Sequence, residues 1–289
     1  MAHVLANGIR MHVQRLSGQR AEGADALPVV PSPPLVVFIH GLVVDNLSSY
    51  YYSLANPVAR AGAEAILYDL RGHGLSERPP AGYTVGEAVT DLVGVLDALG
   101  VDRPVHLVGN SYGGVVALRA ALEVPERVRS LVLIEAHCAD DDEAQGSDWA
   151  ELMADTLTAT ALSLEHDRLP DQLLAVGDRK LARMARTAEA LLSSTTLVED
   201  LAATETFSEL ELAGVHCPVL AVYGEHSDLA PSARALGRHV PACRLEIIPG
   251  LAHTVLREAT GTVLALVLGW LAGDLGVGTA PSAPDGAAG

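Results

Sequence analysis

The sequence predicts an α/β protein with a mostly parallel sheet and helices on both faces of that sheet. Short apolar runs alternate with segments of helical periodicity through most of the chain. The short runs are rich in Val, Ile and Leu, as strands buried on both faces require. The chain has 289 residues, of which 49% are hydrophobic and 19% charged. This composition provides enough apolar material for one large core.

Five runs have the length and composition of buried strands, and a weaker sixth precedes the last predicted helix. They cover residues 36–39, 65–68, 105–108, 131–134, 219–223 and, for the sixth, 244–248. Residues 17–34 predict a loop, because Pro31, Pro33 and Pro34 crowd the entry to the first of these strands.

The clearest predicted helix covers residues 84–99. Thr84 and Glu87 form a capping box at its start, apolar residues recur at helical spacing, and Gly100 ends it. Residues 254–271 predict a closing helix of similar quality.

One interval, residues 137–210, interrupts the alternation of strands and helices. It holds no strand-like run, and its leucines and methionines recur at helical spacing. We therefore expect a core made of residues 1–136 and 211–272, with residues 137–210 inserted as helices. Residues 273–289 are rich in Gly, Ala, Pro and Ser without periodicity, which predicts a disordered tail.

Charge and composition exclude several classes of function. With 19 basic and 36 acidic residues the net charge is −17, so a nucleic-acid partner is not expected. We expect neither a signal peptide nor a membrane span, because the sequence shows no apolar N-terminal stretch of the required length and no uncharged apolar run of about 18 residues.

The cysteines and histidines show no pattern of a disulfide or metal site. Cys138, Cys217 and Cys243 have no paired spacing, which predicts reduced thiols in a cytoplasmic protein. The histidines lack metal-ligand spacing. We expect no metal, no cofactor and a small-molecule substrate, while a homo-oligomer stays open.

A candidate nucleophile lies in residues 109–113, Gly-Asn-Ser-Tyr-Gly. This segment matches the G-x-S-x-G nucleophile elbow, in which a sharp strand-to-helix turn exposes the serine hydroxyl. A glycine-rich turn with an incidental serine is the alternative reading. The predicted strand directly before the segment and the helical pattern directly after it favour a nucleophilic Ser111.

A serine hydroxyl needs a base within hydrogen-bond reach and a carboxylate that orients this base. His253 is the candidate base, in the loop between the last predicted strand and the last helix. Asp228, just past the strand 219–223, is the candidate acid. Glu225 is its nearest rival, and Glu135, at the end of the preceding strand, is a more distant one. Surface residues without a catalytic role are the alternative for each.

The order Ser111, Asp228, His253, with each residue after a predicted strand, resembles the order in the α/β-hydrolase superfamily. The resemblance covers the chain from about residue 35 to 272. It implies an α/β-hydrolase fold in which residues 137–210 occupy the position of a helical cap.

Two further segments support the resemblance. Residues 40–42, His-Gly-Leu, are similar to the HG-x loop of the superfamily. Residues 69–76, Asp-Leu-Arg-Gly-His-Gly-Leu-Ser, are similar to its D-x-R-G-x-G-x-S signature, which we interpret as a structural loop. The resemblance implies an oxyanion hole formed by the backbone N–H groups of Leu42 and Tyr112.

Departures from the superfamily pattern narrow the expected activity. The position that holds the acid in many members is Ser227 here, and Asp228 lies one residue later. Epoxide hydrolases and haloalkane dehalogenases carry Asp at the elbow, so Ser111 argues against both activities. Hydrolases that cleave C–C bonds of ring-fission products typically have Trp after the histidine, whereas Thr254 follows here.

The expected function is that of a serine hydrolase that forms an acyl-enzyme on an ester, thioester or lactone. We expect a small, largely apolar substrate, since Trp149, Met153 and Met184 would give the cap an apolar wall and the surface is acidic. Two alternatives stay open: a C–C bond hydrolase, and a non-hydrolytic cyclase or ligand-binding member of the fold in natural-product metabolism.

Overall fold

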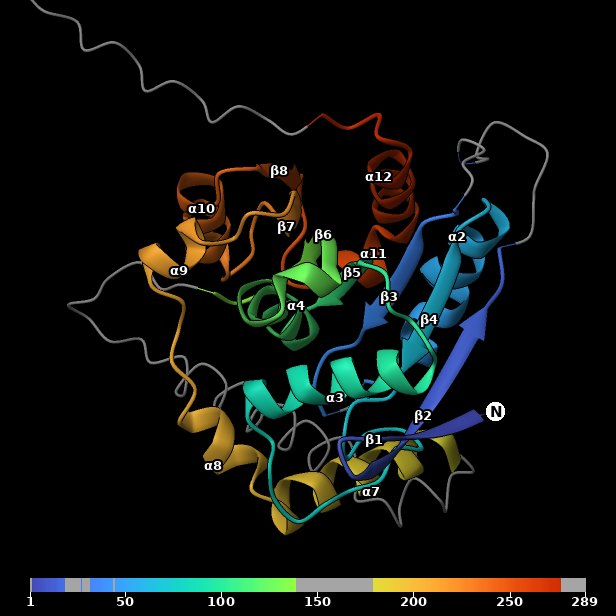
Figure 1. Ribbon diagram of the computed structural model, residues 1–289. Helices are drawn as coiled ribbons and strands as arrows, with labels where there is room; N and C mark the ends of the chain where they lie inside the picture. Colours follow the sequence, from blue (N-terminus) through green and yellow to red (C-terminus); the bar gives the residue numbers. More distant parts are fainter. Residues whose placement is uncertain (1, 19–26, 28–31, 44, 139–178, 277–289) are drawn as a thin grey trace, which may run out of the picture.

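The computed structural model describes residues 2–18, 27, 32–43, 45–138 and 179–276. Within these ranges the strands form one sheet in the order β1-β2-β4-β3-β5-β6-β7-β8 (Figure 1). The strands are β1 Ala2–Ala6, β2 Ile9–Leu16, β3 Leu35–Ile39, β4 Glu64–Tyr68, β5 Val105–Asn110, β6 Val128–Ile134, β7 Val219–Gly224 and β8 Cys243–Ile248. All pairings from β4 to β8 are parallel, which confirms the predicted class of sheet.

The six predicted strands correspond to β3 to β8, whereas β1 and β2 were not predicted. These two form a hairpin, and β2 also pairs antiparallel with β4. Asn7 and Gly8 connect them with positive φ angles of 47° and 75°. An Asn-Gly pair between two short runs is a hairpin signal, so the sequence carries the information for this feature.

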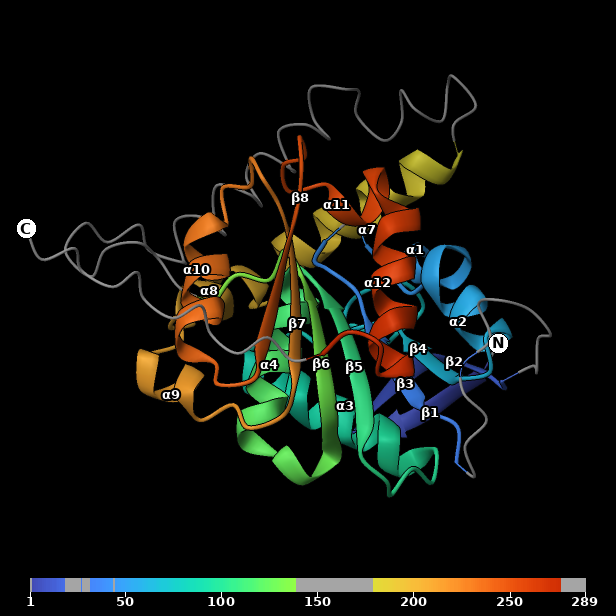
Figure 2. The same cartoon turned by 90° about the horizontal axis from the view of Figure 1, so that it is seen from above.

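Helices cover both faces of the sheet. Those between β3 and β6 are α1 Ser48–Tyr50, which leads through a π-helical turn into α2 Asn56–Arg60, then α3 Val85–Ala98 and α4 Tyr112–Glu123. Later in the chain follow α7 Arg179–Ser194, α8 Leu197–Ala202, α9 Glu209–Ala213, α10 Ala230–His239, α11 Val255–Glu258 and α12 Thr260–Ala272. The sheet separates α2 and α12 from α3 and α4 (Figures 1 and 2).

Successive side chains of a strand point to opposite faces of the sheet. Because helices cover both faces, the central strands are buried on both sides. In β3, Val36 and Phe38 pack in the apolar cluster beneath α2 and α12. Val37 and Ile39 pack in the cluster beneath α3 and α4. This double burial explains the continuous apolar runs in the sequence.

The helix predicted for residues 84–99 is present as α3, whereas the predicted closing helix is divided in two. Thr84 caps α3, and its hydroxyl accepts a hydrogen bond from the Glu87 N–H at 3.2 Å. The predicted closing helix 254–271 is instead two helices, α11 and α12, because Ala259 between them leaves helical geometry with φ −118° and ψ 32°.

The predicted helical insertion, residues 137–210, is described from residue 179 onward and at its first two positions. This described part contains α7, α8 and the beginning of α9, and no strand. The backbone N–H of Tyr83 donates to Asp200 at 2.7 Å, so α8 is tied to the segment after β4.

Several predictions fall outside the described residues. Trp149 and Met153, the side chain of Met184 and most of the tail lie there. The domain boundaries stay a prediction. Among the helices that the structure describes, none is long and apolar enough to cross a membrane.

Candidate active site

Ser111 lies in the sharp turn between β5 and α4. Its backbone has φ 52° and ψ −122°, a conformation that is costly for a residue with a side chain and that marks functional sites. A Cβ at Gly113 would collide with the carbonyl oxygens of Ile39 and His40, so the turn packs directly against the end of β3. The segment therefore has the tight backbone that a nucleophile elbow requires.

The loop after β3 leaves one N–H group free between two that are bound. The Gly41 N–H donates to Asp45 Oδ2 at 2.8 Å, and the Val43 N–H donates to His73 Nε2 at 2.9 Å. Within the described part of the chain, the N–H groups of Leu42 and Tyr112 donate to no backbone or side-chain acceptor. Free donors of this kind are what an oxyanion hole needs.

Two buried histidines, His40 and His73, accept backbone hydrogen bonds in and next to this loop. Burial, followed by the neighbouring His40, lowers the pKa of His73 to about 3, so the His73 ring is neutral and its Nε2 accepts the Val43 N–H. His40 Nε2 accepts the N–H of Leu70 at 2.9 Å. Val43 has φ 65°, which is unfavourable for a β-branched residue. The histidines thus stabilise a loop conformation that the chain by itself disfavours.

His253 lies in the loop after β8, where two carboxylates face its Nδ1 atom. Glu135 Oε2 lies 3.3 Å from Nδ1 and Asp228 Oδ1 lies 3.9 Å away. The structure thus places both Asp228 and its sequence rival Glu135 within 4 Å of His253, with Glu135 the nearer. Among the hydrogen bonds of the described residues, none joins Ser111 Oγ to His253.

Burial acts to lower the pKa of His253, but the hydrogen bond and charge of Glu135, followed by the charge of Asp228, outweigh it. The net result is a pKa raised above the ordinary value of 6.5. A raised pKa makes the imidazole a stronger proton acceptor, as a general base for a serine hydroxyl should be.

The sequence analysis ranked Glu135 too low among the candidate acids. It directly follows β6, and β6 lies between β5, which leads to Ser111, and β7, which leads to Asp228. The signal was its position at a strand end, but the order of strands in the sheet could not be read from the chain. Glu225, the other rival, accepts the Gly250 N–H at 2.9 Å instead.

Other side chains offer weaker candidates for chemistry. Burial raises the pKa of the Cys217 thiol to about 11 and that of Cys243 to about 12, so neither is a thiolate nucleophile at neutral pH. Throughout the described ranges, no three His, Cys, Asp or Glu side chains gather in a way that could hold a metal ion.

The model of the alpha/beta hydrolase fold family matches residues 34–258, and the chain belongs to this family. It is 35% identical to Epoxide hydrolase 2 of Siraitia grosvenorii over 139 residues, 46% of this chain and 38% of the relative. It is 29% identical to 2-(acetamidomethylene)succinate hydrolase of Mesorhizobium japonicum over 242 residues, 78% of this chain and 83% of the relative.

Solved structures show the same fold. The enol-lactonase from Burkholderia xenovorans superposes with a TM-score of 0.66 at 20% identity, covering 93% of this chain and 99% of the lactonase. The match to the Siraitia enzyme spans little more than a third of that relative's length. These comparisons place the chain in the alpha/beta hydrolase fold family.

Proposed function

We propose that this protein is a serine hydrolase of small carbonyl compounds, namely esters, thioesters or lactones. One observation carries the proposal: a strained Ser111 at the end of β5, near the loop after β3. In that loop no described residue accepts the Leu42 N–H, whereas the N–H groups of Gly41 and Val43 are bound. This combination provides a nucleophile and donors for a developing oxyanion.

The reaction uses this chain's own residues. Ser111 Oγ attacks the carbonyl carbon while His253 takes the serine proton. The negatively charged oxygen of the tetrahedral intermediate accepts hydrogen bonds from the backbone N–H groups of Leu42 and Tyr112. The bond to the leaving group then breaks, and His253 returns the proton to that group. Water attacks the resulting acyl-enzyme while His253 takes one of its protons. The bond to Ser111 Oγ then breaks, His253 returns the proton to Ser111 Oγ, and the carboxylic acid product leaves.

The positive imidazolium that forms at each step needs a negative partner at its Nδ1 side. Asp228, the acid that the sequence predicts, and Glu135 both lie within 4 Å of that atom. Removing one oxyanion donor costs about 10² to 10³ in rate in enzymes of this kind, so these two N–H groups would contribute substantially.

The proposed substrate is a small, largely apolar molecule. The net charge of −17 disfavours a polyanion, and Trp149, Met153 and Met184 in the predicted cap would offer an apolar wall. A serine nucleophile also separates this chain from the aspartate chemistry of epoxide hydrolases, despite the partial identity to the Siraitia enzyme.

The first test is labelling with a fluorophosphonate probe, which reacts only with an activated serine. The wild-type chain should be labelled and should hydrolyse members of a p-nitrophenyl ester and acyl thioester panel. Ser111→Ala should lose both, because residues 109–113 contain no other serine. Labelling that persists in Ser111→Ala would overturn the proposal.

The same panel separates the alternatives. Labelling of Ser111 without hydrolysis of any ester or thioester would favour C–C cleavage or a cyclase. Absence of both labelling and hydrolysis would favour a ligand-binding member of the fold.

A further inference from the structure

The two carboxylates beside His253 differ in their distance from the imidazole. Glu135 Oε2 is 3.3 Å from Nδ1, whereas Asp228 Oδ1 is 3.9 Å away, beyond the range of a hydrogen bond. They also follow different strands, since Glu135 comes directly after β6 and Asp228 lies beyond the end of β7. The nearer carboxylate is the one that follows β6, the strand between β5 and β7.

Their exposure to solvent differs far more. The Glu135 side chain is 0% exposed and the Asp228 side chain 66%. Water screens the charge of an exposed carboxylate, so its ion pairs contribute little, whereas a buried carboxylate acts on its neighbour with little screening. The electrostatic effect on His253 therefore comes mainly from Glu135.

The Glu135 carboxylate is also held in place. Its Oε1 accepts the Gly224 N–H at 2.6 Å, and its Oε2 accepts the Ser227 hydroxyl at 2.5 Å. The backbone of Glu135 has φ 50°, an unfavourable conformation for a non-glycine residue. By contrast, no described residue donates a hydrogen bond to the Asp228 carboxylate. Glu135 is thus preorganised and Asp228 is not.

Ser227 explains why an acid that directly follows β6 can act here. It stands three residues after Gly224, where many α/β-hydrolases carry the acid, and its hydroxyl donates to Glu135 instead. The Glu135 carboxylate reaches from the neighbouring strand into the place that an acidic side chain at position 227 would fill.

We infer that Glu135, held by Ser227, is the positioning residue that orients the His253 imidazole and stabilises its cation, and that Asp228 has at most a minor part. The catalytic meaning of this inference rests on the proposed function. Its geometry does not, so the two can be tested separately.

The first experiment follows the His253 imidazole by NMR titration of the full-length chain, with its resonance assigned by its loss in His253→Gln. Among the described residues, the charged groups that face this ring are Glu135 and Asp228. We expect Glu135→Gln to lower the midpoint by about one pH unit or more. Asp228→Asn should lower it by less than about half a pH unit. This readout requires no activity.

The second experiment measures kcat/KM on p-nitrophenyl butyrate and the rate of fluorophosphonate labelling. Glu135→Gln should reduce both by about 10³-fold, mainly through kcat, because the imidazole loses its orienting carboxylate. Asp228→Asn should reduce them by less than about fivefold. Ser227→Asp added to Glu135→Gln should recover part of the lost rate, since it returns a carboxylate to the same place.

The variants distinguish all outcomes. If Asp228→Asn lowers the titration midpoint by about one pH unit or more and the rate by about 10³-fold, the inference is overturned. Because this criterion concerns a surface substitution alone, it holds even if Glu135→Gln fails to fold. If the Glu135 variant alone shifts the midpoint while the wild-type chain neither hydrolyses esters nor is labelled, the proposed function fails and the placement of Glu135 stands.

Discussion

Single residues in this site are held in conformations that their own preferences oppose. Ser111, Glu135 and Val43 all have positive φ angles, at the ends of β5 and β6 and in the loop after β3. Each such residue costs free energy of folding, which the surrounding sheet and hydrogen bonds offset. Their concentration at neighbouring strand ends marks this edge of the sheet as the functional one.

His253 leads to a prediction about pH. In the proposed reaction its neutral form is the base, and its pKa is raised above 6.5, mainly by Glu135. As pH falls through this pKa the ring becomes protonated and cannot accept the serine proton. We therefore expect kcat/KM for ester hydrolysis to fall on the acid side with a midpoint above pH 6.5. Labelling by the fluorophosphonate probe over the same pH range is the control, and a midpoint below 6.5 in both would contradict the assignment.

Strand ends and the loops that follow them bring the candidate residues together. The His226 N–H donates to the Leu251 carbonyl at 2.8 Å, so the loop after β7 is joined to the loop that carries His253. A Cβ at Gly224 would collide with the carbonyl oxygens of Leu251 and Ala252. The absence of a side chain at Gly224 is thus what lets these two loops meet.

Gly224→Ala tests this close approach. The added methyl group should displace the His253 loop, which we expect to lower kcat/KM by about 10²-fold and the free energy of unfolding by about 1–3 kcal/mol. Gly237→Ala is the matched control, because a Cβ there meets Leu245 at an ordinary 3.6 Å and lies within α10. Steady-state kinetics and urea unfolding measure both variants, and equal effects would contradict the prediction.

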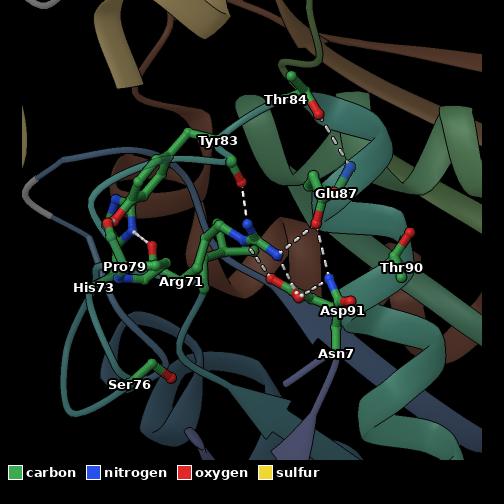
Figure 3. A network of polar contacts seen from close by, with 12 residues as sticks. Asn7, Arg71, His73, Ser76, Pro79, Tyr83, Thr84, Glu87, Thr90 and Asp91 are labelled. Atoms are coloured by element: carbon green, nitrogen blue, oxygen red, sulfur yellow. Dashed lines mark hydrogen bonds and ion pairs between the residues drawn. The ribbon is translucent and has the colours of Figure 1, made fainter. Parts of the chain in front are cut away.

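A buried ion-pair network joins distant parts of the molecule (Figure 3). Arg71, in the loop after β4, donates to Asp91 of α3 through Nε and Nη2, both at 2.6 Å. Asn7, in the β1–β2 turn, donates to Asp91 at 3.0 Å. The D-x-R-G-x-G-x-S segment therefore has the structural contacts that the sequence predicts, and it links the hairpin to the helical layer.

Asp91→Ala should strongly destabilise the fold. It leaves the Arg71 cation buried without its main partner, which costs about 3–5 kcal/mol of unfolding free energy. Glu87→Gln is the control, because Glu87 also pairs with Arg71 but its side chain is 46% exposed, and we expect a loss of at most about 1 kcal/mol. Urea unfolding monitored by circular dichroism gives both values. Similar losses would show that the buried pair has no special role.

The sequence by itself determined the local features. Continuous apolar runs identified β3 to β8, and the glycines around Ser111 identified the elbow, because each depends on residues close together in the chain. The Thr84 N-cap identified α3, although Glu87 pairs with Asn7 and Arg71 and does not complete the predicted capping box. The hairpin of β1 and β2 was missed although the Asn7-Gly8 signal is local.

Only the tertiary structure decided which carboxylate lies nearer to His253 and is buried beside it. From the sequence, Asp228 and Glu225 follow the strand next to the histidine in chain order, and Glu135 lies over a hundred residues away from it. Folding places β6 between β5 and β7, which buries Glu135 beneath His253 and leaves Asp228 in solvent. Distance and burial follow from the order of strands in the sheet. That order depends on packing between distant segments, which no local pattern in this chain encodes.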